Sequence, residues 1–252
     1  MSARSDHADL FSCAGMTAVV AGGAGLIGRE VAAGLAQAGA NVWVADVEIP
    51  DDVRGVSIDI ADEGSVERAL DTVIAADGRL DVVVNCAYPR TSDWGSPLES
   101  ELSTSWVRNL EMQLGGCFIM SRAAAKRMEG RGGSIINFGS IYGSVGPSWE
   151  IYEDTPMTMP SAYAAIKGGV VSLTRLLATR YGPSGVRCNV VSPGGVFDGQ
   201  PEPFVARYEA LTPLGRMADP ADLVGAVVFL ASPASAYVTG QNLIVDGGWT
   251  AR

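Results

Sequence analysis

Three residues in the middle of the chain have the types and spacing of a proton-transfer site. Tyr163 and Lys167 are four residues apart in a segment of helical pattern, so they share one face of that helix. A tyrosine holds its proton until about pH 10, and a nearby ammonium lowers that pKa. Ser140 follows an apolar run, where it can hydrogen-bond a substrate oxygen. We predict that Tyr163 exchanges a proton with a carbinol or carbonyl oxygen. An amphipathic Tyr–Lys pair on a solvated helix is the alternative.

A glycine-rich turn lies well before these residues and has the character of a phosphate-binding turn. Residues 22–28 read Gly-Gly-Ala-Gly-Leu-Ile-Gly, after an apolar run and before a segment of helical periodicity. Glycines permit a tight turn, and the helix that follows points free N–H groups at a pyrophosphate. A plain strand-to-helix turn is the alternative. We predict dinucleotide contacts from Gly22, Gly25, Leu26, Ile27 and Gly28.

Acidic and amide residues end three further apolar runs. Asp46 ends one of them, where a carboxylate accepts hydrogen bonds from ribose hydroxyls and repels a 2'-phosphate. Val47 follows at a position where a 2'-phosphate binder often carries arginine, and Arg29 is the nearest basic residue. Asp59 and Asn85 also end runs, although each is a common strand terminator. This pattern favours NAD over NADP, and a loop cap is the alternative role of Asp46.

The elements that position these residues alternate along the chain. Short apolar runs alternate with helical patterns, as in a parallel sheet covered on both faces. We expect an α/β fold, a doubly wound parallel sheet (Rossmann fold), whose ligand crevice lies beyond the carboxyl ends of the strands. The predicted strands cover residues 17–21, 41–45, 56–58, 80–84, 134–138, 186–191 and 242–245, and the predicted helices cover 27–38, 63–76, 101–128 and 161–181.

Length and composition limit the possible functions. The 252 residues contain no linker or repeat, so we expect a single domain over residues 10–252 after a disordered tail at 1–9. A net charge of −10 argues against nucleic acid or an anionic membrane as partner. We expect no signal peptide and no membrane span, and with four scattered cysteines a cytoplasmic location. The one histidine, His7, lies in the expected tail, which argues against a Ser-His-Asp hydrolase and a metal site.

Together these segments resemble the short-chain dehydrogenases/reductases, in their compact single-domain branch. The resemblance runs from Leu10 to Trp249. It implies a small-molecule substrate and hydride transfer with NAD(P)(H), with Ser140 positioning substrate, Tyr163 as acid/base and Lys167 binding the nicotinamide ribose. It also implies a homodimer or homotetramer paired through the helices at 101–128 and 161–181. The further cofactor contacts that it implies are Asp59, Ile60, Asn85, Ala87, Tyr163, Lys167, Pro193, Gly194 and Val196.

The sequence departs from that family at several positions. Ala21 and Leu26 stand where threonine and glycine are usual. The asparagine that usually serves a water-linked proton relay aligns with Gln113, and Asn109 is a second candidate. The threonine that usually holds the nicotinamide amide aligns near Asp198. The resemblance therefore implies Gln113 as a fourth catalytic residue, and it leaves the relay and the amide contact open.

The segment 141–160 is longer than is usual in the family and mixes aromatic residues with carboxylates. At an active-site rim this mixture suits a polyhydroxylated substrate, and a surface loop or subunit contact is the alternative. With residues 87–90 and 197–204, the segment resembles oxidoreductases of flagellin modification and legionaminic-acid synthesis. We expect an NAD(H)-dependent oxidoreductase that interconverts a secondary alcohol and a ketone on a sugar or similar polar metabolite. A reductase of an apolar or acyl ketone and a catalytically weak nucleotide-sensing protein are the alternatives.

Overall fold

The structure, a computed structural model, describes residues 7–252. Residues 1–6 of the predicted tail lie outside the described residues. The described part of the chain begins with a short 3-10 helix at His7–Phe11. Among the described residues, no helix is long and apolar enough to cross a membrane.

Seven strands form one parallel sheet in the order β3-β2-β1-β4-β5-β6-β7, which confirms the predicted doubly wound fold. The predicted strands are all present, with ends shifted by at most two residues. Parallel pairing places the carboxyl ends of successive strands side by side, so that Ala21 pairs with Asn85 and Asn85 with Asn137. The strands are β1 Thr17–Ala21, β2 Asn41–Asp46, β3 Gly55–Ser57, β4 Val82–Asn85, β5 Gly133–Phe138, β6 Val186–Pro193 and β7 Asn242–Val245.

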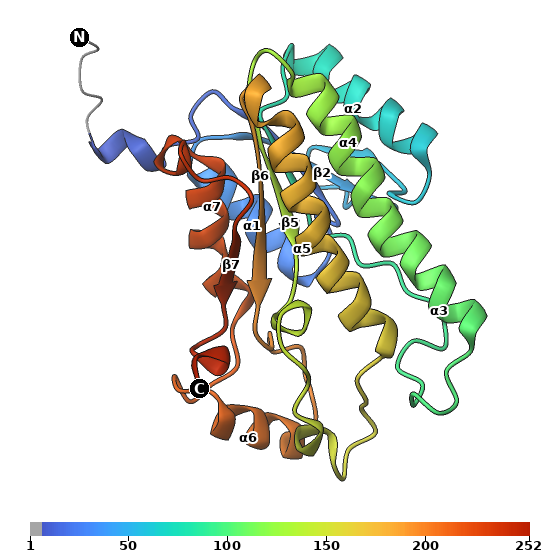
Figure 1. Cartoon of the computed structure of the whole chain (residues 1–252). Helices are drawn as coiled ribbons and strands as arrows, with labels where there is room; N and C mark the ends of the chain where they lie inside the picture. The colour runs from blue at the N-terminus through green and yellow to red at the C-terminus, as the bar shows by residue number, and fades with distance from the viewer. Residues whose placement is uncertain (1–6) are drawn as a thin grey trace.

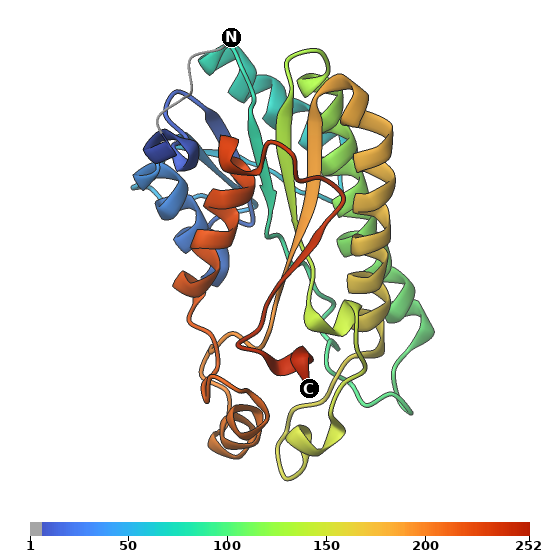
Figure 2. The same ribbon diagram turned by 60° about the vertical axis from the view of Figure 1, so that its left-hand side comes forward.

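Two helical layers cover the sheet (Figures 1 and 2). Side chains alternate across a strand, and β1 shows this directly. Ala18 and Val20 face the core shared with α1 (Leu26–Gln37) and α7 (Val224–Ala231). Val19 and Ala21 face the core shared with α2 (Glu63–Asp77), α4 (Gly116–Met128) and α5 (Ser161–Tyr181). Burial on both faces explains why the strands read as continuous apolar runs.

The predicted helix at 101–128 is interrupted. Its parts are α3 (Ser103–Asn109), a π-helical segment at Leu110–Gly115, and α4. Gly116 packs so closely on Ile60 that a Cβ there would lie 2.8 Å from Ile60 Cδ1. Single π-helical turns of this kind occur often at functional sites.

Two helices were not predicted from the sequence. These are α6 (Glu202–Leu211) and α7. The α7 segment is apolar on all sides, so it lacks the helical periodicity that marks an amphipathic helix. α6 begins directly after Pro201, and Pro203 lies in its first turn, where proline is tolerated.

The loops at the carboxyl edge of the sheet extend well beyond the strands. The 3-10 turns Ile141–Gly143 and Trp149–Tyr152 lie there with α6 (Figures 1 and 2). They share a separate apolar cluster, whose buried members are Ile141, Ile151, Phe204, Tyr208, Met217 and Trp249.

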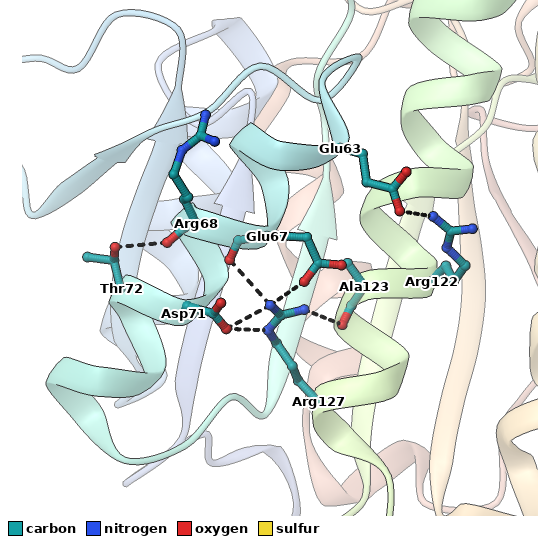
Figure 3. A network of polar contacts seen from close by, with 8 residues as sticks. All are labelled: Glu63, Glu67, Arg68, Asp71, Thr72, Arg122, Ala123 and Arg127. Atoms are coloured by element: carbon teal, nitrogen blue, oxygen red, sulfur yellow. Dashed lines mark hydrogen bonds and ion pairs between the residues drawn. The ribbon is translucent and has the colours of Figure 1, made fainter.

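An ion-pair network holds α2 against α4 (Figure 3). The Arg127 guanidinium pairs with Glu67 and, at 2.7 Å, with Asp71, while Arg122 pairs with Glu63. Arg127 is the most shielded of these side chains, at 14% exposure. The network therefore anchors the helical layer behind β1 and β4 through largely surface contacts, which contribute modestly to stability.

Candidate active site

Ser140 and Lys167 come together because the end of β5 packs directly on α5. A Cβ at Gly143 would lie 2.7 Å from the backbone of Lys167, so only glycine lets the turn at 141–143 approach the helix this closely. Ser140 caps that turn by accepting a hydrogen bond from Tyr142 N at 3.2 Å. Lys167 Nζ donates to Phe138 O at 2.9 Å. The three predicted residues Ser140, Tyr163 and Lys167 line one cavity.

A buried polar network fixes the position of α5 on the sheet. Asn137 Nδ2 donates to Thr174 Oγ1 at 3.0 Å, and Asn137 Oδ1 accepts from Ser121 Oγ at 3.1 Å. All three side chains are fully buried. Because a broken member would leave unpaired polar atoms in the core, the network specifies one register of α4 and α5 against β5.

Burial dominates the protonation of the site. It raises the pKa of Tyr163 above the usual value, although a hydrogen bond with the Ser140 side chain acts in the opposite direction. It also lowers the pKa of Lys167 to about 8. The prediction that Lys167 lowers the pKa of Tyr163 below its ordinary value is therefore wrong, because that pKa is raised. Desolvation is the largest cause of the raised pKa and Tyr152 acts in the same direction, while Lys167 Nζ lies 5.5 Å from the centroid of the Tyr163 ring.

Two aromatic side chains pack edge-on against Tyr163. The ring centroids of Tyr88 and Trp94 lie 5.9 and 6.3 Å from that of Tyr163, at interplanar angles of 80° and 73°. Such T-shaped contacts are favoured for aromatic pairs, so they restrict the Tyr163 ring. Neither Tyr88 nor Trp94 was predicted from the sequence to be a site residue. Tyr88 follows the carboxyl end of β4 closely, and that position was the available signal.

A groove of about 510 Å³ lies along the carboxyl ends of β1 to β4. Every cofactor residue predicted from the first four strands and the glycine turn lines it, with the exception of Asn85. These residues are Gly22, Gly25, Leu26, Ile27, Gly28, Asp46, Asp59, Ile60 and Ala87. The groove is therefore in the place where the sequence predicted a dinucleotide.

The glycine turn packs closely on neighbouring backbone and leaves the N-terminus of α1 without a side-chain cap. Gly22 has φ +72°, and a Cβ there would lie 2.6 Å from Ala87, while a Cβ at Gly28 would lie 2.0 Å from Gly22 O. Gly25 is the N-cap of α1 and offers no side chain to the first-turn N–H groups. Those N–H groups therefore remain for a ligand, and their helix end favours negative charge. The residues fit the diphosphate of a nicotinamide dinucleotide.

Asp46 lines the groove with its carboxylate held by backbone. Its Oδ2 accepts from Ala24 N at 3.1 Å and its Oδ1 accepts from Val47 N at 2.8 Å. Val47 is 66% exposed and brings no positive charge. Arg29 lies on the outer side of the glycine turn, in a different groove beside Ala24 and Arg54. Among residues 7–252, Arg90 is the arginine that lines the groove of Asp46, and Arg29 does not line it.

Three amide side chains lie behind the cavities. Gln113 is 5% exposed, sits in the π-helical segment, and has no hydrogen-bond partner for either amide atom among the described residues. Asn85 is buried too, and its Oδ1 lacks a partner within the same residues. Asn109 instead donates to Thr91 Oγ1 and Ser105 O, each at 2.9 Å. Asn109 therefore ties the loop after β4 to α3, and Gln113 is the relay candidate with unused hydrogen-bonding capacity.

A second cavity, of about 420 Å³, adjoins the groove and contains Ser140, Tyr163 and Lys167. The predicted residues Pro193, Gly194 and Val196 line it as well. Six residues line both cavities and mark their junction: Leu26, Ile27, Cys86, Tyr88, Arg90 and Asp198. We call this second cavity the substrate pocket.

The outer wall of the substrate pocket is built from aromatic and methionine side chains. They come from the 141–160 segment, from α6 and from the loop after it: Tyr142, Tyr152, Met157, Met159, Phe204, Tyr208 and Met217. We expected aromatic residues and carboxylates of the 141–160 segment at the rim of the site. The aromatic residues line the pocket, and the carboxylates do not. Glu150, Glu153 and Asp154 are exposed and do not line the pocket, and Asp154 pairs with Arg207 at 2.9 Å. Charged side chains turn to water because burying them unpaired is costly.

Comparisons with known proteins agree with this architecture. A family model described as enoyl-(acyl carrier protein) reductase matches residues 22–250. A cis-4-hydroxycyclohexanecarboxylate dehydrogenase of Sinomonas cyclohexanicum is 37% identical over 251 residues, covering 93% of this chain and 96% of that protein. The post-translational flagellin modification protein A of Campylobacter coli is 31% identical over 246 residues, covering 91% and 96%. It matches the narrower resemblance found in the sequence.

Solved structures extend the similarity to the whole fold. A short-chain dehydrogenase of Leptospira borgpetersenii with bound NAD⁺ has a TM-score of 0.86 at 33% identity, covering 99% of this chain and 98% of that one. A gluconate 5-dehydrogenase of Burkholderia cenocepacia in complex with NADP and tartrate has a TM-score of 0.86 at 29% identity, covering 98% and 100%. Fold, site and relatives together show that the chain belongs to the short-chain dehydrogenases/reductases, oxidoreductases that act on CH–OH groups.

Proposed function

We propose that this protein is an NAD(H)-dependent oxidoreductase that interconverts a secondary alcohol and a ketone on a polar metabolite, with Tyr163 as acid/base. The observation that carries the proposal is the junction of the two cavities. Tyr163, Ser140 and Lys167 lie in a pocket that shares Leu26, Ile27 and Cys86 with the glycine groove. A nicotinamide held at that junction supplies or accepts the hydride.

The proton steps follow from the burial of the site. Burial holds Tyr163 neutral by raising its pKa, so its hydroxyl is a proton donor to a carbonyl oxygen at neutral pH. Ser140 orients the same substrate oxygen through its hydroxyl. Lys167, anchored on Phe138 O, keeps a positive charge beside Tyr163 below its pKa of about 8 and offers its remaining N–H donors to the cofactor ribose. Oxidation of the alcohol runs through the same atoms in reverse.

Gln113 completes the proposed site as part of a water-linked proton relay. A buried amide without a protein partner costs stability unless water satisfies it. Both amide atoms of Gln113 are in that state, and Asn109 is not. We therefore favour Gln113 over Asn109 for the relay.

NAD is the proposed cofactor because Asp46, at the carboxyl end of β2, lines the groove where we expect the adenosine ribose to bind. A 2'-phosphate there would meet a carboxylate, with Val47 rather than a cation beside it. The remaining proposed contacts are those predicted from the sequence: Gly22, Gly25, Leu26, Ile27, Gly28, Asp59, Ile60, Asn85, Ala87, Pro193, Gly194 and Val196.

The lining of the substrate pocket favours a substrate with an apolar body, as in the alternative of an apolar or acyl ketone. Met157, Met159 and Met217 line the substrate pocket together with aromatic rings. Relatives that act on hydroxycyclohexanecarboxylate and gluconate support a ring or polyol instead of an acyl chain. We therefore propose a compact polar substrate whose C–H faces contact these side chains.

We propose a homodimer or homotetramer formed through α4 and α5. Phe118 on α4 and Leu176 on α5 are 39% and 60% exposed, so each of these helices presents a large apolar side chain that a partner subunit would cover. Light scattering at micromolar concentration tests this proposal, and a monomeric mass would contradict it. We retain the cytoplasm as the expected compartment, since all four cysteines are free thiols.

The function is tested by stopped-flow and steady-state absorbance at 340 nm, with NAD⁺ or NADH and a panel of cyclic hydroxy acids, sugars, polyols and their ketones. We expect turnover with at least one polar alcohol or its ketone, and a lower KM for NAD(H) than for NADP(H). Turnover limited to long-chain ketones would favour the apolar alternative. Tight cofactor binding without turnover on any member would favour the nucleotide-sensing alternative.

A further inference from the structure

Few charged groups line the substrate pocket, and one of them is a cation without a partner. Lys167 is buried in the wall, while Arg90 and Asp198 are exposed at the junction with the groove. No ion pair joins Arg90 to any carboxylate among residues 7–252. The carboxylates of the 141–160 segment are exposed and do not line the pocket, so among the described residues Asp198 is the carboxylate in its wall.

Tyr88 holds that cation close to the proposed acid/base. The Arg90 guanidinium carbon lies 5.2 Å from the centroid of the Tyr88 ring, a distance at which a cation and an aromatic face attract each other. The same ring lies 5.9 Å from the Tyr163 ring and 5.6 Å from Lys167 Nζ. The guanidinium and the Tyr163 ring therefore both lie against the Tyr88 ring, and all three line the substrate pocket.

The remaining wall suits the body of such a substrate. Tyr142, Tyr152 and Met157 line the pocket. Among the described residues, Arg90 and Lys167 are the cations that line it. The Tyr142 hydroxyl is buried without a hydrogen-bond partner among the described residues, so it can serve a substrate oxygen. A cavity of about 420 Å³ accepts a single substituted ring.

We propose that the substrate is a compact, ring-bearing hydroxy or oxo acid, and that Arg90 binds its carboxylate while its carbinol or carbonyl carbon lies at Tyr163. This inference rests on the proposed function and names the substrate class of the same site. A guanidinium presents two parallel N–H donors that match a planar carboxylate. A phosphate ester carries the same charge type, but a doubly charged group generally gathers more donors than one exposed arginine supplies.

Asp198 gives the proposal a test of sign. It lines the junction with Arg90, and its negative charge repels a bound carboxylate. If Arg90 binds substrate, Asp198→Asn should strengthen carboxylate binding while Arg90→Gln weakens it. If instead Arg90 and Asp198 pair with each other when the site fills, the two variants should both weaken binding.

The experiment measures binding to the full-length enzyme saturated with NADH. Isothermal titration calorimetry compares cyclohexanecarboxylate with cyclohexanecarboxamide, which has the same ring and no charge. We expect the carboxylate to bind roughly 10- to 100-fold more tightly, the scale of a charge-assisted hydrogen bond. Arg90→Gln should abolish that preference, and Arg90→Lys should retain part of it because the charge remains without the planar fork.

Arg68→Gln is the matched control, because it removes one exposed positive charge on α2 (Figure 3). The carboxylate preference should survive it. Equal binding of the two probes, binding of neither probe, or a preference that survives Arg90→Gln would overturn the proposal. The Kd of NADH, measured by fluorescence for each variant, separates substrate recognition from an Arg90 contact with the cofactor diphosphate. A loss confined to NADH binding would also overturn it.

Turnover distinguishes failure of this inference from failure of the proposed function. cis-4-Hydroxycyclohexanecarboxylate and its amide are assayed with NAD⁺. If both are oxidised equally well, the function stands and the carboxylate inference fails. If neither is oxidised but the carboxylate probe still binds through Arg90, the substrate class stands and the redox assignment fails. A phosphorylated sugar preferred over both acids, with dependence on Arg90, would replace carboxylate by phosphate and overturn the proposed class.

Discussion

The groove and the substrate pocket adjoin each other but are built in different ways. The groove consists of glycines, backbone N–H groups and residues that end β1 to β4, within the first 90 residues and Asp198. The pocket draws side chains from the loop after β4, from β5, α5, the 141–160 segment and α6, and most of its outer wall is aromatic or methionine. NAD and NADP carry the same diphosphate, so backbone N–H groups can recognise that part of either cofactor, whereas a particular substrate requires particular side chains.

The two regions also differ in charge. In the groove the ionisable group with the clearest proposed role is Asp46, held by two backbone N–H groups. In the pocket burial controls protonation, since it raises the pKa of Tyr163 and lowers that of Lys167. Changes in the groove should therefore alter cofactor choice, and changes in the pocket should alter proton transfer and substrate choice.

The largest expected effect is that of Tyr163→Phe, which tests whether proton transfer depends on this side chain of the substrate pocket. The ring keeps its edge-on contacts with Tyr88 and Trp94, but the transferable proton is lost. We expect turnover to fall by roughly 10²–10⁴-fold. NADH affinity and melting temperature should stay within error of the parent values. Near-normal turnover would assign the proton to another group.

The next effect concerns the groove alone. Asp46→Ala combined with Val47→Arg should shift the ratio of kcat/KM for NAD(H) over NADP(H) toward NADP(H) by about 10- to 100-fold, since a repelling charge is replaced by an attracting one. The KM for the alcohol, measured at saturating cofactor, should change little. A parent enzyme that already prefers NADP(H) would contradict the role given to Asp46.

The pH dependence of ketone reduction probes the buried charge of the pocket. Burial lowers the pKa of Lys167 to about 8, so its ammonium is present below that pH and lost above it. If the charge is needed, reduction should decline as pH rises through about 8, with a limiting slope of about tenfold per unit. Lys167→Arg keeps a charge at all accessible pH values and should remove this decline in whatever activity remains. A profile of the parent enzyme that stays flat from pH 7 to 10 would argue that the Lys167 charge is dispensable.

The smallest expected effect lies at a residue that lines neither cavity. Gln113→Met removes a buried amide whose atoms have no protein partner and keeps the side-chain length. We expect turnover to fall by about tenfold while the protein gains about 1 kcal/mol of stability, visible as a rise of about 2–4 °C in Tm. Lower stability with unchanged turnover would show that Gln113 is structural.

How much of the site was readable from the sequence differs between the two regions. In the groove, Gly22, Gly28 and Asp46 each act at a strand end or a turn, and such positions follow from local patterns. In the pocket, Ser140, Tyr163 and Lys167 were readable as a set. Phe204 and Met217 were not, because their part in the wall depends on how distant loops fold over the sheet edge.

The sequence by itself determined the alternation of strands and helices, the glycine turn, and the residues that meet where parallel strands end, because these depend on short-range periodicity and on the geometry of a parallel sheet. Tertiary structure alone decided three other features. It interrupted the helix around Gln113 where Gly116 meets Ile60, and it turned the carboxylates of the 141–160 segment to solvent. It also reversed the expected direction of the Tyr163 pKa, because desolvation depends on everything packed around a group and spacing along the chain does not record it.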